Sequence, residues 1–113
     1  MFQSVTMNAL SSALDGLALR QRTIAQNIAN VNTPNYRAKV VSFENALAQS
    51  VADGSGVAGA STTDSSAPTR QDGNNVSLDS ETLNNIETVL RYQFATRAVN
   101  MDFDATQSAL KTA

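Results

Sequence analysis

Apolar positions divide the chain into two helical ends and a middle without a sustained pattern. Near the N-terminus, apolar residues recur at alternating steps of three and four, the heptad spacing of a helix that presents one stripe to a partner. We therefore predict a helix over residues 5–31, roughly 40 Å long at about 1.5 Å per residue. The stripe consists of Met7, Leu10, Leu14, Leu17, Gln21, Ile24, Ile28 and Val31.

A second helical pattern covers the C-terminal part of the chain. Ser77 and Asp79 are both suitable N-caps, and Glu81 then lies in the first turn, where negative charge is favoured. The helix carries two apolar stripes, which indicates two sets of neighbours. One stripe comprises Leu83, Ile86, Leu90, Phe94, Ala98, Met101, Ala105 and Ala109, and the other, at steps of seven, comprises Val89, Thr96, Phe103 and Leu110.

The middle of the chain has weaker signals. A strand-like Val40-Val41 pair precedes a possible short helix on which Phe43, Leu47 and Val51 share a face. Residues 50–69 use only seven residue types. Such low complexity predicts a flexible or loosely extended surface segment rather than a core.

These patterns predict an all-α fold, with long N- and C-terminal helices that pack as a coiled coil and a loosely structured middle segment that joins them. We divide the chain into an N-terminal helix and turn (residues 1–36), a flexible middle segment (37–73) and a C-terminal helix (74–113). The heptad stripe does not by itself show whether its partner helix belongs to the same chain or to another.

The N-terminal helix is unusually poor in charge. Residues 1–31 contain only Asp15, Arg20 and Arg22 as charged side chains, and small uncharged polar residues occupy most positions outside the stripe. Such residues let neighbouring helices approach closely while their polar groups stay hydrogen-bonded. A chain of 113 residues has too little other material to cover that face, so the composition indicates self-assembly.

The N-terminal helix is predicted to end at a turn formed by Thr33, Pro34, Asn35 and Tyr36. Pro34 pushes the preceding residue toward extended geometry and suits the second position of a β-turn. Asn35 tolerates a positive φ, so the prediction is a type II turn. Tyr36 then brings an aromatic ring to pack and a hydroxyl to hydrogen-bond.

Charge and composition exclude several classes of function. With 8 Lys and Arg against 10 Asp and Glu, the chain lacks the basic face of a nucleic-acid binder. Without His or Cys, neither Ser-His nor Cys-His nucleophile pairs nor the common zinc sites can be built, so we predict no enzyme and no cofactor. No apolar run approaches the roughly 20 residues that span a bilayer. The N-terminus lacks the basic start and apolar block of a cleaved secretory signal.

Residues 19–39, LRQRTIAQNIANVNTPNYRAK, resemble the N-terminal signature of bacterial flagellar rod and hook proteins, whose centre reads N-I-A-N-x-N-T-P-x-Y. The segments FENAL, DGNNVSLDSE and LRYQFATRAVNMDF resemble the proximal rod subunits of that family. The resemblance covers about residues 9–49 and 71–111. The family usually has Gly in place of Asn35, which agrees with a positive φ at this position.

This resemblance implies a non-enzymatic structural subunit of the flagellar basal-body rod, which self-assembles through its terminal helices into the drive shaft that transmits torque. The implied partners are further copies, other rod subunits, the junction protein between the rod and the membrane ring, and the flagellar type III export apparatus. The implied location is the periplasmic rod, reached without a cleaved signal peptide. The alternative function is a helical adaptor, secreted or cytosolic, that binds a partner helix bundle.

The predicted functional residues form two groups. Asn27 and Asn32 flank the heptad stripe, where amides can fix the register between helices without the desolvation cost of buried charges. The turn motif is Asn32, Thr33, Pro34, Asn35 and Tyr36. The predicted assembly interface is Leu10, Leu14, Leu17, Gln21, Ile24, Asn27, Ile28, Val31, Leu83, Ile86, Leu90, Phe94, Met101 and Phe103.

Overall fold

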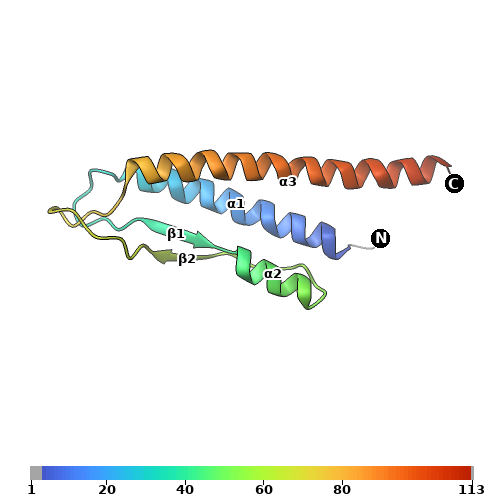
Figure 1. Cartoon of the computed structure of the whole chain (residues 1–113), viewed down its shortest axis with the longest axis horizontal. Coiled ribbons are helices and arrows are strands. Elements are labelled where there is room, and N and C mark those ends of the chain that lie inside the picture. Colours follow the sequence, from blue (N-terminus) through green and yellow to red (C-terminus); the bar gives the residue numbers. More distant parts are fainter. Residues whose placement is uncertain (1–3, 113) are drawn as a thin grey trace.

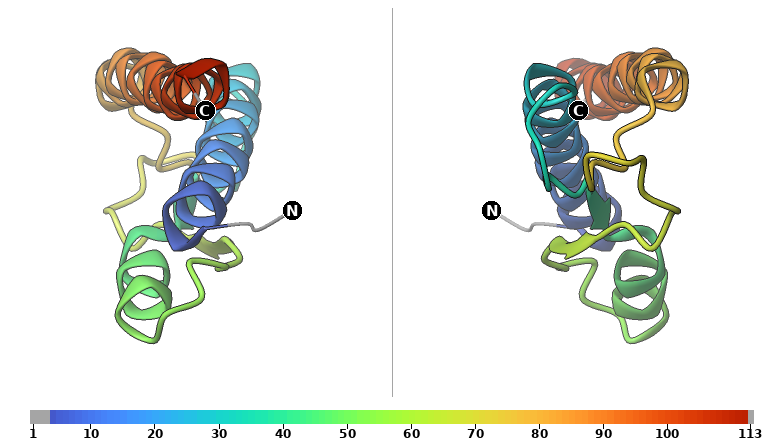
Figure 2. Two further views of the ribbon diagram at one scale, coloured as in Figure 1. Left: turned by 90° about the vertical axis from the view of Figure 1, so that its right-hand side faces the viewer. Right: turned by 90° about the vertical axis from the view of Figure 1, so that its left-hand side faces the viewer.

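Two long antiparallel helices form the body of the molecule. The computed structural model describes residues 4–112, which form α1 (Val5–Ala29), β1 (Lys39–Ser42), α2 (Glu44–Ala52), β2 (Ser61–Asp64) and α3 (Leu78–Thr112). Helix α1 is the central element, because it contacts α3, β1 and α2 (Figures 1 and 2). The predicted packing of the N- and C-terminal helices is confirmed. At one end of the pair, the end of α1 and the start of α3 lie together; we call this the closed end (Figure 1).

Helix α1 is capped at both ends by local hydrogen bonds. The Ser4 hydroxyl accepts from the Met7 N–H at 3.0 Å, which satisfies one of the first free amides of the helix. The helix ends at Ala29, two residues before the predicted end at Val31, because the chain is already turning at Asn30. The Asn30 N–H is shared between the carbonyls of residues 26 and 27.

The turn after α1 has the predicted geometry. Asn35 has φ 62°, which confirms the positive φ expected at the third position of a type II turn. The Tyr36 N–H donates to the Thr33 carbonyl at 3.3 Å and closes the turn. Asn tolerates this left-handed conformation better than other residues with a side chain.

The middle segment, predicted to be loosely structured, contains β1, α2 and β2. The two strands pair antiparallel, from Lys39 opposite Asp64 to Ser42 opposite Ser61. Two polar contacts hold the segment that follows α2 against α1. The Asn8 amide donates to the Ser55 carbonyl, and the Ser12 hydroxyl donates to the Gly56 carbonyl, both at 3.1 Å. These side chains bond to backbone carbonyls, which every residue has. The apolar pattern of the sequence therefore could not predict these contacts.

A small apolar core lies between α1 and the start of α2. Leu17, Val41 and Phe43 are buried together. The Phe43 ring lies against Gly16 of α1, and the Arg20 guanidinium covers the ring at 4.8 Å from its centroid. The core is small because much of the remaining packing in the molecule is polar.

Helix α3 packs inward through small and polar residues, whereas the large apolar residues of its predicted stripes are mostly exposed. Its N-cap is Ser77, whose hydroxyl accepts from the Ser80 N–H at 3.3 Å, so Asp79 as the cap was wrong. Glu81, Thr88 and Ala95, at steps of seven, are the buried residues of α3. Thr88 and Ala95 are small, which allows α3 to approach its neighbours closely. The Thr88 hydroxyl is satisfied by the Asn84 carbonyl at 2.6 Å, so it can be buried.

The packing of Phe43 on α1 gives a test of the fold. A Cβ built on Gly16 lies 2.5 Å from a Phe43 ring carbon, so Gly16→Ala should force the ring away. We expect a net loss of about 1–2 kcal/mol in the free energy of unfolding, since overpacking outweighs the helix propensity gained. The matched control is Gly59→Ala, where a Cβ has nothing within 4 Å and little change is expected. Urea denaturation measures both, and equal stabilities would contradict the packing.

Candidate functional site at the closed end of the helix pair

Three buried asparagines gather where α1 ends and α3 begins. Asn27 lies near the end of α1, and Asn74 and Asn75 lie in the loop just before α3. Asn27 and Asn74 are among the least exposed residues, at 1% and 0%. Buried amides are costly unless each donor and acceptor is paired. We call these three side chains, with the groups they bind, the amide clasp.

Asn27 joins four parts of the chain. Its Nδ2 donates to the Lys39 carbonyl at 2.9 Å and to Glu81 Oε1 at 3.0 Å. Its Oδ1 accepts from the Lys39 N–H at 2.9 Å and from the Tyr36 hydroxyl at 3.3 Å. One side chain thus connects α1 to the turn, to the first residue of β1 and to the first turns of α3.

Asn74 binds the end of α1. Its Nδ2 donates to the carbonyls of Asn30, at 2.9 Å, and Thr33, at 2.8 Å. Asn30 caps α1 and Thr33 begins the turn, so this side chain adds a second donor to each carbonyl and joins the loop before α3 to both. Its Oδ1 accepts from the Val76 N–H at 2.7 Å, which holds the chain on its way into α3.

Asn75 binds the strands instead. Its Oδ1 accepts from the Ala38 N–H at 2.6 Å, and its Nδ2 donates to the carbonyls of Ser65 and Ala67, both at 3.1 Å. It therefore ties the residue before β1 to the residues that follow β2. The two adjacent asparagines thus bind different segments: Asn74 binds the end of α1 and the turn, and Asn75 binds the hairpin.

The turn after α1 and the loop before α3 fit together closely. The Asn35 N–H donates to the Asp72 carbonyl at 2.8 Å. Gly73, at φ 80°, lies so near that a Cβ there would meet Asn35 Oδ1 at 2.3 Å. Arg70 spans the same junction, with hydrogen bonds of 2.6 Å to the carbonyls of Val31 and Val76. The loop thus needs glycine at residue 73 both for its backbone angle and for space.

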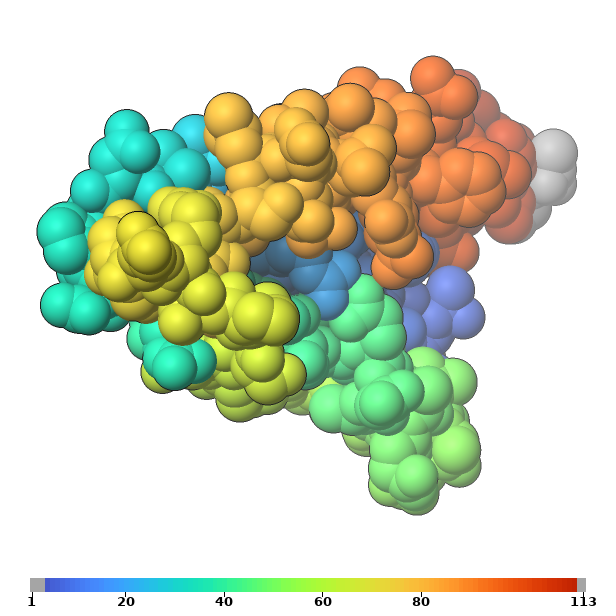
Figure 3. Space-filling view, turned by 60° about the vertical axis from the view of Figure 1, so that its left-hand side comes forward, coloured from blue at the N-terminus to red at the C-terminus, as the bar shows by residue number. Residues whose placement is uncertain are grey.

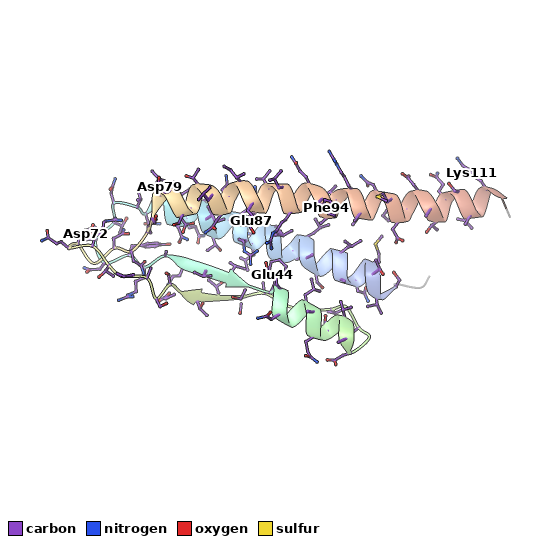
Figure 4. The ribbon with its side chains drawn as sticks, viewed as in Figure 1. Glu44, Asp72, Asp79, Glu87, Phe94 and Lys111 are labelled. Atoms are coloured by element: carbon purple, nitrogen blue, oxygen red, sulfur yellow. The ribbon has the colours of Figure 1, made fainter. Side chains whose placement is uncertain are left out.

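Farther along the helix pair, ion pairs connect all three helices. Arg20 of α1 holds Glu44 with two bonds of 2.6 and 2.7 Å, and Arg91 of α3 reaches the same carboxylate at 3.2 Å. Arg91 also pairs with Glu87 at 2.5 Å, and Figure 4 shows Glu87 on α3 and Glu44 at the start of α2. The hydrogen bonds from Arg20 lower the pKa of Glu44 to about 2. Glu44 therefore stays ionised at any pH near neutrality.

The predicted interface residues separate into an inward and an outward set. Leu17, Ile24 and Asn27 are buried within the chain. Leu10, Leu14, Ile28 and Val31 are half-buried, and Gln21 is exposed although it lies on the predicted stripe. The six predicted residues of α3, Leu83, Ile86, Leu90, Phe94, Met101 and Phe103, are all exposed.

The turn motif lies at the surface except for its last residue. Asn32, Thr33, Pro34 and Asn35 are exposed, whereas Tyr36 is half-buried against Asn27. Asn32 was predicted to set the register between helices. Because it is exposed, it does not set the register between helices of its own chain. Asn27 does join the two long helices, but through bonds within its own chain.

The N-terminal region, with Asn27 and the turn, is the part that matches a known family model. Residues 7–37 match the model described as flagella basal body rod protein. The flagellar basal body rod protein FlgB of Bacillus subtilis (strain 168) is 32% identical over 95% of this chain and 94% of its own length. The chain belongs to the FlgB family of flagellar basal body rod proteins.

Other FlgB proteins match a shorter stretch. Those of Borrelia hermsii and Borreliella burgdorferi are each 53% identical, over 34% and 30% of this chain and 28% and 25% of their own lengths. The predicted identity is confirmed: this FlgB family member is a structural subunit of the flagellar basal-body rod, and the adaptor alternative falls away. Within residues 4–112, no helix is long and apolar enough to cross a membrane.

Sequence reasoning missed most of the clasp. The sequence predicts an N-cap shortly after Asn74 and Asn75 but no partner for either side chain. Sequence reasoning placed Glu81 in the first turn as a favourable charge and did not foresee its burial. The available signal was the resemblance of DGNNVSLDSE to proximal rod subunits, which marks a loop with a specific structure but does not show what it touches.

Asn27 gives the sharpest test of the clasp. Asn27→Ala removes partners from the Lys39 backbone, the Tyr36 hydroxyl and Glu81, which stay buried or half-buried. We expect a loss of about 3 kcal/mol in the free energy of unfolding, since each buried group left unpaired costs roughly 1–3 kcal/mol. Asn32→Ala, at an exposed position in the same motif, should change stability by less than about 0.5 kcal/mol. Similar losses in the two variants would show that the clasp contributes little.

Asn35 tests the turn. Asn35→Gly should be neutral or slightly stabilising, because Gly adopts φ 62° without strain. Asn35→Val should cost on the order of 1–2 kcal/mol, because a β-branched residue resists the left-handed conformation. Swimming assays of complemented cells, together with urea denaturation, should show a defect for Val alone. The same result for both substitutions would mean that the Asn35 side chain matters more than its backbone angle.

Proposed function

We propose that this rod subunit self-assembles through the outward face of α3 into the drive shaft that transmits torque. The supporting observation is an apolar stripe that residues 4–112 leave exposed. Leu83, Ile86, Leu90, Phe94 and Met101 recur along one side of α3, and Phe94 is 77% exposed. Soluble monomers rarely expose a contiguous apolar surface of this length. α3 runs along one edge of the molecule, accessible to neighbours (Figure 3).

The division of polar and apolar faces supports this proposal. Within the chain, the Asn27–Glu81 hydrogen bond joins α1 to α3, and the Arg20–Glu44–Arg91 ion pairs link the two helices farther along, so directional polar contacts help to set their geometry. The apolar stripe is left for contacts between subunits, where the hydrophobic effect is the main driving force. A subunit arranged in this way reaches its own shape first and gains most of its apolar burial on assembly.

The estimated free energies of burial and association indicate that each subunit needs several neighbours. Full burial of one large apolar side chain contributes roughly 1.5–3 kcal/mol, so the five stripe residues contribute on the order of 10 kcal/mol. Association costs an estimated 4–15 kcal/mol in lost freedom of motion. A single contact along this stripe is therefore marginal. The second predicted stripe, with Phe103 and Leu110 exposed where α3 runs past α1, supplies a further contact (Figure 1).

A drive shaft must also resist twisting within each subunit. Two sets of contacts oppose such motion here, the amide clasp at the closed end and the Arg20–Glu44–Arg91 ion pairs farther along. Together they tie α1, α2, α3 and the hairpin to one another. Torque applied at the outer face of α3 is then passed to α1 through directional bonds.

The further partners follow from family membership. In this proposal the subunit contacts other rod subunits and the junction protein between the rod and the membrane ring. It leaves the cell through the flagellar type III export apparatus without cleavage and occupies the periplasmic part of the rod. The flagellar rod relatives and the rod family match support these assignments.

The stripe is tested by adding a charge to it. Phe94→Asp should abolish incorporation into the rod and swimming, because it places an unpaired carboxylate in the contact, while the free energy of unfolding of the dilute chain stays within about 0.5 kcal/mol. Asn100→Asp adds the same charge at an exposed position off the stripe and should swim normally. Rod fractions probed by immunoblot and swimming halos provide the measurement.

A contrasting variant separates assembly from folding. Leu17→Asp places a charge in the intrachain core and should lose stability even in the dilute chain. If Phe94→Asp destabilises the dilute chain as much as Leu17→Asp does, or if Phe94→Asp cells swim normally, the outward stripe is not the assembly face.

A further inference from the structure

A cleft opens beside the clasp, between α1, β1 and α3. It encloses about 200 Å³, and Figure 3 shows a recess beneath α3 with α1 on its floor. Glu81 lines this cleft and is only 7% exposed. Its Oε1 accepts from the Asn27 amide, but its Oε2 has no hydrogen-bond partner within residues 4–112. A carboxylate in this position has lost water and gained one neutral donor in exchange.

The charged groups around the cleft do not compensate this carboxylate. They come from all three elements: Arg20 of α1, Lys39 of β1, and Glu87 and Arg91 of α3. Each cation is paired with another acid, since Arg20 binds Glu44, Lys39 binds Asp64, and Arg91 binds Glu44 and Glu87. The position thus suits a neutral carboxylic acid better than an ion.

We propose that Glu81 is a protonation-controlled latch of the amide clasp: as the neutral acid it lets α1 and the start of α3 close on each other, and its ionisation loosens that contact. The assignment rests on its place in the fold. Within residues 4–112, the only hydrogen bond of the Glu81 side chain goes to Asn27, the side chain that joins the two helices. Any movement that rehydrates Oε2 therefore also strains the clasp.

The direction of the pH effect follows from the burial. Desolvation raises the pKa of Glu81 above its ordinary value of 4.5. The folded chain then holds this proton more tightly than the unfolded chain, so folding is favoured as the pH falls. The gain appears as the pH drops through the raised pKa and is complete below 4.5. Glu44, whose pKa is about 2, keeps its charge and its ion pairs over that whole range.

Urea denaturation of the full chain at pH 5 and pH 8 tests the latch. The wild type should unfold at a higher urea concentration at pH 5 than at pH 8. The gain in the folding constant approaches about tenfold for each unit by which the pKa is raised only below 4.5, so pH 5 shows part of it. Glu81→Gln keeps the acceptor for Asn27 and removes the titration, so its midpoint should be the same at both pH values and above that of the wild type at pH 8.

Glu87→Gln is the matched control. It neutralises another carboxyl that lines the same cleft on the same helix, but one that is exposed and paired with Arg91. This variant should keep the pH dependence of the wild type. A wild type whose pH dependence matches that of Glu81→Gln would overturn the proposal, as would a chain with no cooperative transition, because a latch requires a closed clasp.

A second measurement does not depend on the behaviour of a variant. The side-chain carboxyl carbon of Glu81, followed by NMR in the folded wild type, should titrate with a midpoint above 4.5. A midpoint at or below that value would overturn the proposal even if Glu81→Gln fails to fold.

Discussion

The hydrogen bonds of the Asn27 side chain are the interaction on which the rest of this structure depends. Four groups from three other segments meet at one amide: both backbone groups of Lys39, the Tyr36 hydroxyl and the Glu81 carboxyl. An amide can serve them all because it combines two donors with an acceptor that has two lone pairs. An apolar residue could fill the same space but could not fix which segments meet there, because apolar packing has no direction.

This polar junction explains how so small a chain keeps a defined shape with so small a core. Within residues 4–112, the buried apolar cluster consists of Leu17, Val41 and Phe43, with partly buried neighbours packed against it. Asn74 and Asn75 extend the polar network to the end of α1 and to the hairpin, and Arg20 joins α1 to α2. The large apolar residues of α3 then face outward, where the proposed contacts with other subunits would bury them. A chain that buried them itself would have less to gain from its neighbours.

Several local features could be predicted because their cause lies within a few residues. Asn35 takes a positive φ since Pro34 precedes it and the turn permits little else, and a strand does begin near Val40-Val41. The face of α3 that packs inward could not be predicted. Glu81, Thr88 and Ala95 are spaced by sevens, but small and polar side chains give no hydrophobic signal, whereas Leu90 and Phe94 do. Apolar periodicity shows that a face will be covered and does not show by which molecule.

The sequence by itself determined the two long helices, the turn between α1 and β1, and membership in the rod family, because helix periodicity, turn chemistry and a contiguous motif are all local properties. Only the tertiary structure decided which faces of α1 and α3 meet, that residues 50–69 include a strand, and that Asn27 binds Glu81, 54 positions away. These outcomes depend on hydrogen bonds between distant segments. The donors and acceptors for such bonds are present in nearly every residue, so the choice among them is made only when the chain has folded.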